Sequence, residues 1–155
     1  MTPAINFIEK EKIPYTLHEY THDSSNTSYG LEAASKMNVD EKRVYKTIVI
    51  SLSNSKLAVG IIPVTSMLSM KLIAKSLKVK KATMADALDV ERSTGYILGG
   101  VSPLGQKRRL QTILDSSAQE FSTIFVSAGQ RGLELEINPH DLIKLSNGIL
   151  HSITQ

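Results

Sequence analysis

The chain has 155 residues, of which 41% are hydrophobic, and this is enough for one domain with its own core over residues 1–155. Its 18 Lys and Arg against 15 Asp and Glu give a net charge of +3, which is too small to indicate nucleic-acid binding through bulk charge alone. The absence of cysteine excludes a disulfide-built scaffold, a thiolate metal centre and a cysteine nucleophile.

The first part of the chain predicts a helix, a strand and a second helix. A Thr-Pro pair at the start is a cap and first-turn signal, and apolar residues recur behind it at helical spacing over residues 3–12. Alternating β-branched or aromatic and polar residues predict a strand over residues 15–20, followed by a polar loop over 22–28. A short helix is expected over residues 30–37.

The middle of the chain predicts a β-hairpin followed by two short helices. Two β-rich runs, residues 45–52 and 56–64, are separated by a Ser-Asn-Ser turn. Apolar residues on one helical face predict a helix over residues 69–77. A strand over residues 81–84 and a helix over residues 85–92 are expected next.

The last part of the chain predicts a glycine-rich segment, a second hairpin and a closing helix. Residues 95–105 are uncharged and contain several glycines. Strands are expected over residues 123–127 and 133–137 on either side of a turn at 128–132, and a helix over residues 139–145. This mixture predicts an α+β fold, a single domain with a mixed, largely antiparallel β-sheet or partial barrel flanked by helices.

No segment suits a membrane span or a signal peptide. The longest uncharged runs, residues 57–70 and 93–106, contain proline and fall short of the ~20 apolar residues that a span needs. Charged residues at positions 9–12 interrupt the only apolar stretch near the start. We therefore expect a soluble cytoplasmic protein with no membrane partner.

Residues 18–22 spell His-Glu-Tyr-Thr-His, the pattern of zinc peptidases, in which a helix places two histidines one turn apart. Here the segment has the composition of a strand, where residues four apart lie ~13 Å from each other, too far to share one ion. We expect no metal and no other cofactor, and a zinc peptidase that uses His18 and His22 is kept as an alternative.

Residues 100–107 are close to a nucleotide phosphate loop but depart from it in chemistry. The lysine comes one residue late, an arginine replaces the magnesium-binding hydroxyl, and Pro103 removes an amide donor. A nucleotide triphosphatase is therefore rejected. The pair Gly99-Gly100 remains either a tight turn or a place where a ligand approaches the backbone.

Lys46 is a charged residue on the apolar side of a predicted strand. It shares parity with Ile48, Ile50 and Leu52. One interpretation is that the ammonium extends to water from the end of the strand. The other is a cation at the mouth of a pocket, placed to meet a phosphate or a carbonyl that gains negative charge.

Basic residues are concentrated in one part of the chain. Residues 71–109 hold nine of the 18 basic residues and only three acids, so this stretch is positive and the remainder is negative. Two clusters flank the glycine-rich segment and suggest a polyanion with one special end rather than a long stacked single strand, because aromatics make up only 5%. The candidate phosphate contacts are Lys71, Lys75, Lys78, Lys80, Lys81, Lys107, Arg108 and Arg109.

Several motifs together resemble one known family, the YbaK-type Cys-tRNA(Pro) deacylases, which are free-standing relatives of the prolyl-tRNA synthetase editing domain. The longest motif is Gly-Gly-Val-Ser-Pro-Leu-Gly-Gln-Lys at residues 99–107. The resemblance runs in order over nearly the whole chain, through residues 1–4, 20–23, 44–47, 84–86, 92–96, 99–107 and 126–133.

The resemblance implies trans editing, in which cysteine is removed from proline tRNA and from other mischarged cysteinyl-tRNAs. The partners it implies are the acceptor end of a mischarged tRNA and prolyl-tRNA synthetase, with no DNA. It also implies that the cysteinyl thiol attacks its own ester and leaves as a thiolactone. Two alternatives stay open beside the zinc peptidase, a deacylase that prefers another amino acid, such as Ala-tRNA(Pro), and a noncatalytic tRNA-binding module.

The resemblance also assigns site residues by position. Lys46 corresponds to the essential lysine, and the basic residues named above would contact tRNA phosphates. The residues that would bind the aminoacyl end are Tyr20, Tyr29, Gly99, Gly100, Val101, Ser102, Pro103, Ser127 and Gly129. The chain departs from the family pattern at Tyr29, Ala128 and Glu134, which bear on the shape of the pocket.

Overall fold

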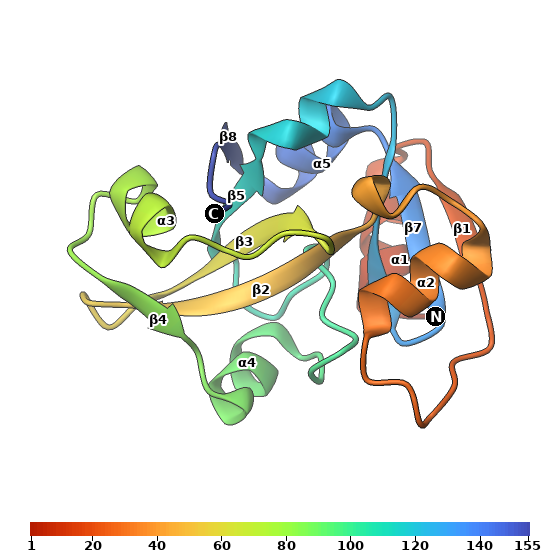
Figure 1. Cartoon of the computed structure of the whole chain (residues 1–155), viewed down its shortest axis with the longest axis horizontal. Coiled ribbons are helices and arrows are strands. Elements are labelled where there is room, and N and C mark those ends of the chain that lie inside the picture. The colour runs from red at the N-terminus through yellow and green to blue at the C-terminus, as the bar shows by residue number, and fades with distance from the viewer.

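The computed structural model describes residues 1–155 as two β-sheets with helices around them (Figure 1). The helices are α1 (Pro3–Glu11), α2 (Tyr29–Met37), α3 (Met70–Ser76), α4 (Ala87–Thr94) and α5 (Pro139–Ser146), with short 3₁₀ turns η1 (Glu41–Arg43) and η2 (Ser116–Glu120). The strands are β1 (Thr16–Glu19), β2 (Tyr45–Leu52), β3 (Leu57–Pro63), β4 (Ala82–Met84), β5 (Gln111–Asp115), β6 (Ile124–Gln130), β7 (Leu133–Ile137) and β8 (Ile149–His151).

The predicted α+β class, both hairpins and all five helices are confirmed, with ends that differ by one or two residues except in β6, which runs three residues further than predicted, to Gln130. Four of the six strand pairings are antiparallel, and the two sheets do not close into a barrel. The strands β5 and β8 and the turns η1 and η2 were not predicted. β5 is a short buried run with no alternation of polar and apolar residues, and β8 is only three residues long. No helix is long and apolar enough to cross a bilayer.

The two sheets meet at one point beside the hairpin strand β2. One sheet has the order β1-β7-β6 and the other the order β4-β2-β3-β5-β8. A single parallel bridge between Val44 and Phe125 joins them at the start of β2. Beyond this bridge β2 and β6 belong to different sheets, so the two parallel strands separate and leave an opening between them.

The strand β2 packs apolar side chains on both of its faces, whereas the sequence predicted one apolar face. Tyr45 and Val49 pack into the main core between the sheets, while Ile50 and Leu52 pack on the opposite face with Ile73 of α3. β2 is therefore a central strand covered on both faces, which the alternation of its residues does not reveal. A third, small cluster packs Ala33 and Ala34 of α2 against Phe125 and so covers the outer face of the three-stranded sheet.

Candidate active site

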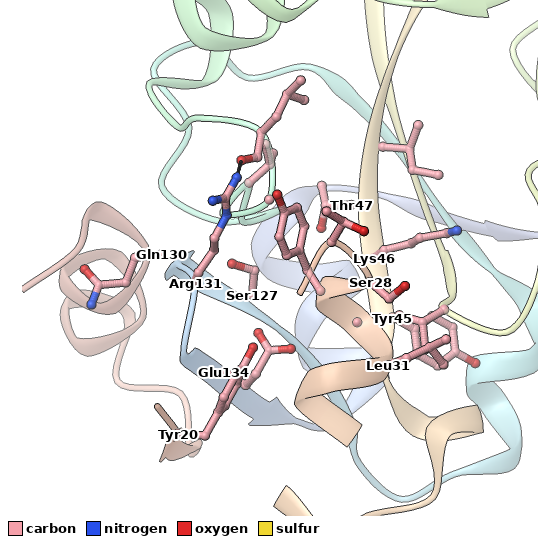
Figure 2. A pocket seen from close by; sticks show the side chains of 18 residues that line it. Tyr20, Ser28, Leu31, Tyr45, Lys46, Thr47, Ser127, Gln130, Arg131 and Glu134 are labelled. Atoms are coloured by element: carbon pink, nitrogen blue, oxygen red, sulfur yellow. Dashed lines mark hydrogen bonds between the residues drawn. The ribbon is translucent and has the colours of Figure 1, made fainter. Parts of the chain in front are cut away.

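A cleft of about 380 Å³ lies where β2 and β6 separate (Figure 2). Its walls come from β2, from the start of α2, from the segment around Gly99 and from the β6–β7 hairpin. This volume lies in the range of small-molecule sites. Of the residues assigned to the aminoacyl end or to catalysis, those that line the cleft are Tyr20, Tyr29, Lys46, Gly99, Val101 and Ser127.

Gly100, Ser102, Pro103 and Gly129 do not line the cleft. Gly100, Ser102 and Pro103 are buried behind it, and the Ser102 carbonyl accepts a hydrogen bond from the Gln106 side-chain amide at 2.9 Å. The glycine-rich segment therefore reaches the cleft through Leu98, Gly99 and Val101. The other residues anchor the segment to the core.

Arg131 closes one end of the cleft and was not predicted as a site residue. Its Nη2 atom donates to the Leu98 carbonyl at 2.9 Å, and its guanidinium carbon lies 4.2 Å from the centre of the Tyr29 ring. A Cβ atom at Gly99 would lie 2.5 Å from Arg131 Nε, and Gly99 has a φ of +88°. A side chain at this position would collide with the stacked pair, which explains the need for glycine. No signal in the sequence marks Arg131, because the contact joins three distant segments.

The edge of β2 that faces β6 presents unpaired backbone groups. The Leu52 N–H donates to Lys56 at 2.8 Å, so by alternation the even-numbered residues of β2 pair with β3. The N–H and C=O of Thr47 therefore point away from β3, toward the opening. The Thr47 hydroxyl is also buried and has no hydrogen-bond partner.

Lys46 lies on the rim of the cleft with its amine free. Its side chain is exposed and makes no hydrogen bond or ion pair with another residue. Figure 2 shows its amine directed away from Ser127 and Glu134. The two cations that line the cleft are Lys46 and Arg131, and Arg131 already contacts Leu98 and Tyr29. Lys46 is therefore the cation available to a ligand.

Glu134 is a buried carboxyl that opens only to the cleft. It lies on β7 directly opposite Ser127 on one side and His18 on the other, it is 7% exposed, and no hydrogen bond or ion pair reaches it. Burial raises the pKa of Glu134 to about 8. The sequence Leu-Glu-Leu-Glu-Ile would place Glu134 on a solvated face, and packing of α2 over that face buries it instead.

Glu136, two residues along the same face, has the partners that Glu134 lacks. It accepts hydrogen bonds from Thr123 at 2.6 Å and Arg43 at 3.3 Å, and His18 Nε2 lies 2.9 Å away. The bond from Thr123, helped by His18 and Arg43, lowers the pKa of Glu136 in spite of partial burial. One strand thus carries one satisfied and one unsatisfied carboxyl.

Glu32 fixes α2, and with it one wall of the cleft. Its side chain is 1% exposed and lies 2.6 Å from His22 Nδ1 and 3.1 Å from Lys36 Nζ, and it accepts the Asp23 N–H at 2.8 Å. Burial by itself would raise the pKa of Glu32, but these bonds outweigh it and lower the pKa. They tie the turn after Tyr20 to the first turns of α2.

Comparison with known proteins gives the family of the chain. The profile of a family described as "Aminoacyl-tRNA editing domain" matches residues 25–145, which is most of the chain. The chain belongs to this family. The editing domain is accordingly a hydrolase that acts on aminoacyl-tRNA.

One curated relative and one solved structure match the editing domain over nearly its whole length, and a second curated relative matches less than half of it. It is 35% identical over 99% of its residues to EbsC of Enterococcus faecalis, whose name describes a candidate Cys-tRNA(Pro)/Cys-tRNA(Cys) deacylase, and it covers 93% of that protein. It is 35% identical to the uncharacterized YwhH of Bacillus subtilis over 43% of its own length and 42% of that protein's. The crystal structure of a candidate trans-editing enzyme for prolyl-tRNA synthetase has the same fold, with a TM-score of 0.84, 16% identity and coverage of 100% of this chain and 99% of that one.

The candidate phosphate contacts of the editing domain lie outside the cleft. None of the eight basic residues lines it. Lys71 and Lys75 are on α3, and the lysines that follow lead to β4, at the far end of the molecule from α2 in Figure 1. Arg108 and Arg109 line a separate hollow beside Phe7. Both clusters contain exposed charges, so they form a basic surface away from the cleft.

The two histidines of the zinc-peptidase pattern are held apart by different carboxylates. His18 is on β1 and contacts Glu136, whereas His22 is in the turn after β1 and contacts Glu32. No three His, Asp or Glu side chains of the editing domain are grouped so that they could hold a metal ion.

The buried Glu134 predicts a pH dependence of stability. A pKa raised from 4.5 to about 8 by folding means that the contribution of Glu134 is complete below its ordinary pKa and is lost as pH rises through about 8. Between about pH 5 and pH 8, the editing domain should lose on the order of 3 kcal/mol of unfolding free energy relative to its Glu134→Gln variant. Urea denaturation of both proteins at the two pH values measures this difference. If the unfolding free energies of the two proteins changed in parallel with pH, the pKa of Glu134 would not be raised by folding.

Proposed function

We propose that this editing domain removes cysteine from Cys-tRNA(Pro), and from other cysteinyl-tRNAs, with the cysteinyl thiol as the nucleophile. The observation that carries the proposal is a cleft with a free cation and open backbone groups but no paired nucleophile and base. The chain has no cysteine, no histidine lines the cleft, and Ser127 Oγ accepts the Gly129 N–H at 3.1 Å without a bond to Glu134. The name of the Enterococcus relative supports the substrate.

The proposed reaction balances without a protein nucleophile. The sulfur of the cysteinyl group bonds to the ester carbonyl carbon, the bond from that carbon to the ribose oxygen breaks, and the thiol proton ends on the ribose oxygen. The products are a cysteine thiolactone, which water then opens, and a tRNA with a free terminal hydroxyl. The cleft needs only to hold sulfur and carbonyl close together, which can remove several kcal/mol of barrier.

In this proposal Lys46 contacts the terminal phosphate of the acceptor end or the carbonyl, and backbone N–H groups near Gly99 contact the oxyanion or the ribose. The exposed amine of Lys46 favours the phosphate. The basic surface away from the cleft would hold the tRNA body through its phosphates, so binding should weaken with salt. Prolyl-tRNA synthetase remains a candidate partner.

The proposed function is tested with proline tRNA charged separately with cysteine, alanine, serine and proline. Cysteine should be released at least 100-fold faster than alanine or proline, because neither offers a side-chain nucleophile and serine offers a poorer one. Loss of ester over time in the presence of a chelator measures this, with protein-free samples as control. Equal release of alanine would identify an Ala-tRNA(Pro) deacylase, tRNA binding without release a binding module, and sensitivity to the chelator a metal enzyme.

A further inference from the structure

Two buried polar groups in the cleft have no partner within the protein. They are the carboxyl of Glu134, a residue that is 7% exposed, and the fully buried hydroxyl of Thr47. Both residues line the same cleft, and they come from opposite walls, Glu134 from β7 and Thr47 from β2 (Figure 2). A buried polar group without a hydrogen bond is costly, so both groups require an explanation.

The protein has no cation placed to satisfy Glu134. Arg131 bonds to Leu98 and stacks on Tyr29, and the amine of Lys46 points away. Lys36 contacts Glu32 and the Thr21 carbonyl. Burial is the cause of the raised pKa of Glu134, with no opposing attraction from a positive charge. In contrast, three side chains satisfy Glu136 on the same face of the same strand.

The unsatisfied carboxyl therefore indicates a cationic ligand group. At the acceptor end of an aminoacyl-tRNA, the aminoacyl ester carries one positive charge that does not depend on its side chain, the α-ammonium group. Its three N–H donors match the acceptors at the cleft, because the Glu134 carboxylate has two oxygens and the Thr47 carbonyl, on the open edge of β2, can also accept.

We propose that Glu134, with Thr47, binds the α-ammonium group of the aminoacyl ester and so selects substrates with a free amino group. The inference rests on one part of the proposed function, namely that the ligand is an aminoacyl ester. It does not depend on which amino-acid side chain the ester carries. When the ammonium enters, the carboxyl gives its proton to solvent and the two charges pair. An N-acylated or peptidyl-tRNA has no such charge, leaves Glu134 unsatisfied, and is rejected.

The test compares two ligands that differ in one group and cannot be cleaved. Both are acceptor-stem microhelices that end in 3′-amino-3′-deoxyadenosine, one carrying an amide-linked cysteinyl group and the other 3-mercaptolactyl, in which a hydroxyl replaces the ammonium. Titration calorimetry at about pH 7 should show that the wild-type protein binds the cysteinyl ligand at least 10-fold more tightly. Equal affinities would overturn the proposal without any variant.

Two variants test whether Glu134 is the source of the preference for the cysteinyl ligand. In Glu134→Gln the ratio of affinities should fall to within about twofold, because the amide cannot pair with the ammonium. Glu136→Gln, on the same face of the same strand, should keep the wild-type ratio. A Glu134→Gln protein that is folded by circular dichroism and retains the preference would overturn the assignment. Because neither ligand is cleaved, the ratio of their affinities does not depend on deacylation. The preference for the ammonium can therefore fail while the proposed deacylation holds, and the reverse.

Discussion

Replacing Lys46 with alanine is expected to lower kcat/KM for deacylation by about 100-fold while leaving the fold intact. The amine is the free cation of the cleft, and a charged hydrogen bond is worth about 1.5–3 kcal/mol, or about 2.7–4 kcal/mol where it stabilises a developing oxyanion. A 100-fold change corresponds to about 2.7 kcal/mol. Because the side chain is exposed and makes no bond within the protein, stability should change by less than about 0.5 kcal/mol.

Single-turnover kinetics with Cys-tRNA(Pro) measure this loss and assign its origin. A loss mainly in KM indicates contact with the terminal phosphate, whereas a loss mainly in kcat indicates contact with the carbonyl. Lys42→Ala is the matched control, because Lys42 is an exposed lysine a few residues away that does not line the cleft. Near-normal turnover by Lys46→Ala would remove Lys46 from the mechanism.

Replacing Glu32 with alanine should lower the free energy of unfolding by about 3–5 kcal/mol, the usual cost of removing one partner from a buried charged network. The Asp23 N–H, His22 and Lys36 all lose their common acceptor. A domain of ordinary stability has only about 5–15 kcal/mol in total, so the variant is expected to be marginally folded. The start of α2 should loosen first, and Tyr29 with it.

Urea denaturation at neutral pH measures this change. Glu41→Ala is the control, because Glu41 is an exposed acid close to α2, and its replacement should cost less than about 0.5 kcal/mol. Lys36→Ala should also have a small effect, since that side chain is 36% exposed and its ion pair is screened by solvent. A loss below about 1 kcal/mol in Glu32→Ala would mean that the network does not hold α2.

Hydrogen exchange offers a local view of the same network. The hydrogen-bonded amides of α2, beginning with the Glu32 N–H that donates to the Ser28 carbonyl, should lose protection in Glu32→Ala more than amides in β2 and β3, which lie inside the larger sheet. Uniform loss across the chain would instead indicate that Glu32 affects only global stability.

The amino-acid sequence by itself determined the local structure and the family. Caps, turn residues and apolar spacing act between neighbours in the chain, so the helices and the two hairpins followed from them, and the motif at 99–107 carried the family resemblance. That Lys46 lies at a pocket could also be predicted, because a lysine that shares a strand face with Ile48, Ile50 and Leu52 is anomalous.

Only the tertiary structure decided which side chains meet in the cleft. Glu134 and Glu136 look equivalent in sequence, but only Glu136 finds donors, on segments as distant as Arg43. Arg131 reaches Leu98 and Tyr29 only after three segments converge, and Ser102 and Pro103 turn into the core although they lie in the same motif as Gly99. Burial and pairing depend on residues far apart in the chain, and the periodicity of a single segment carries no information about them.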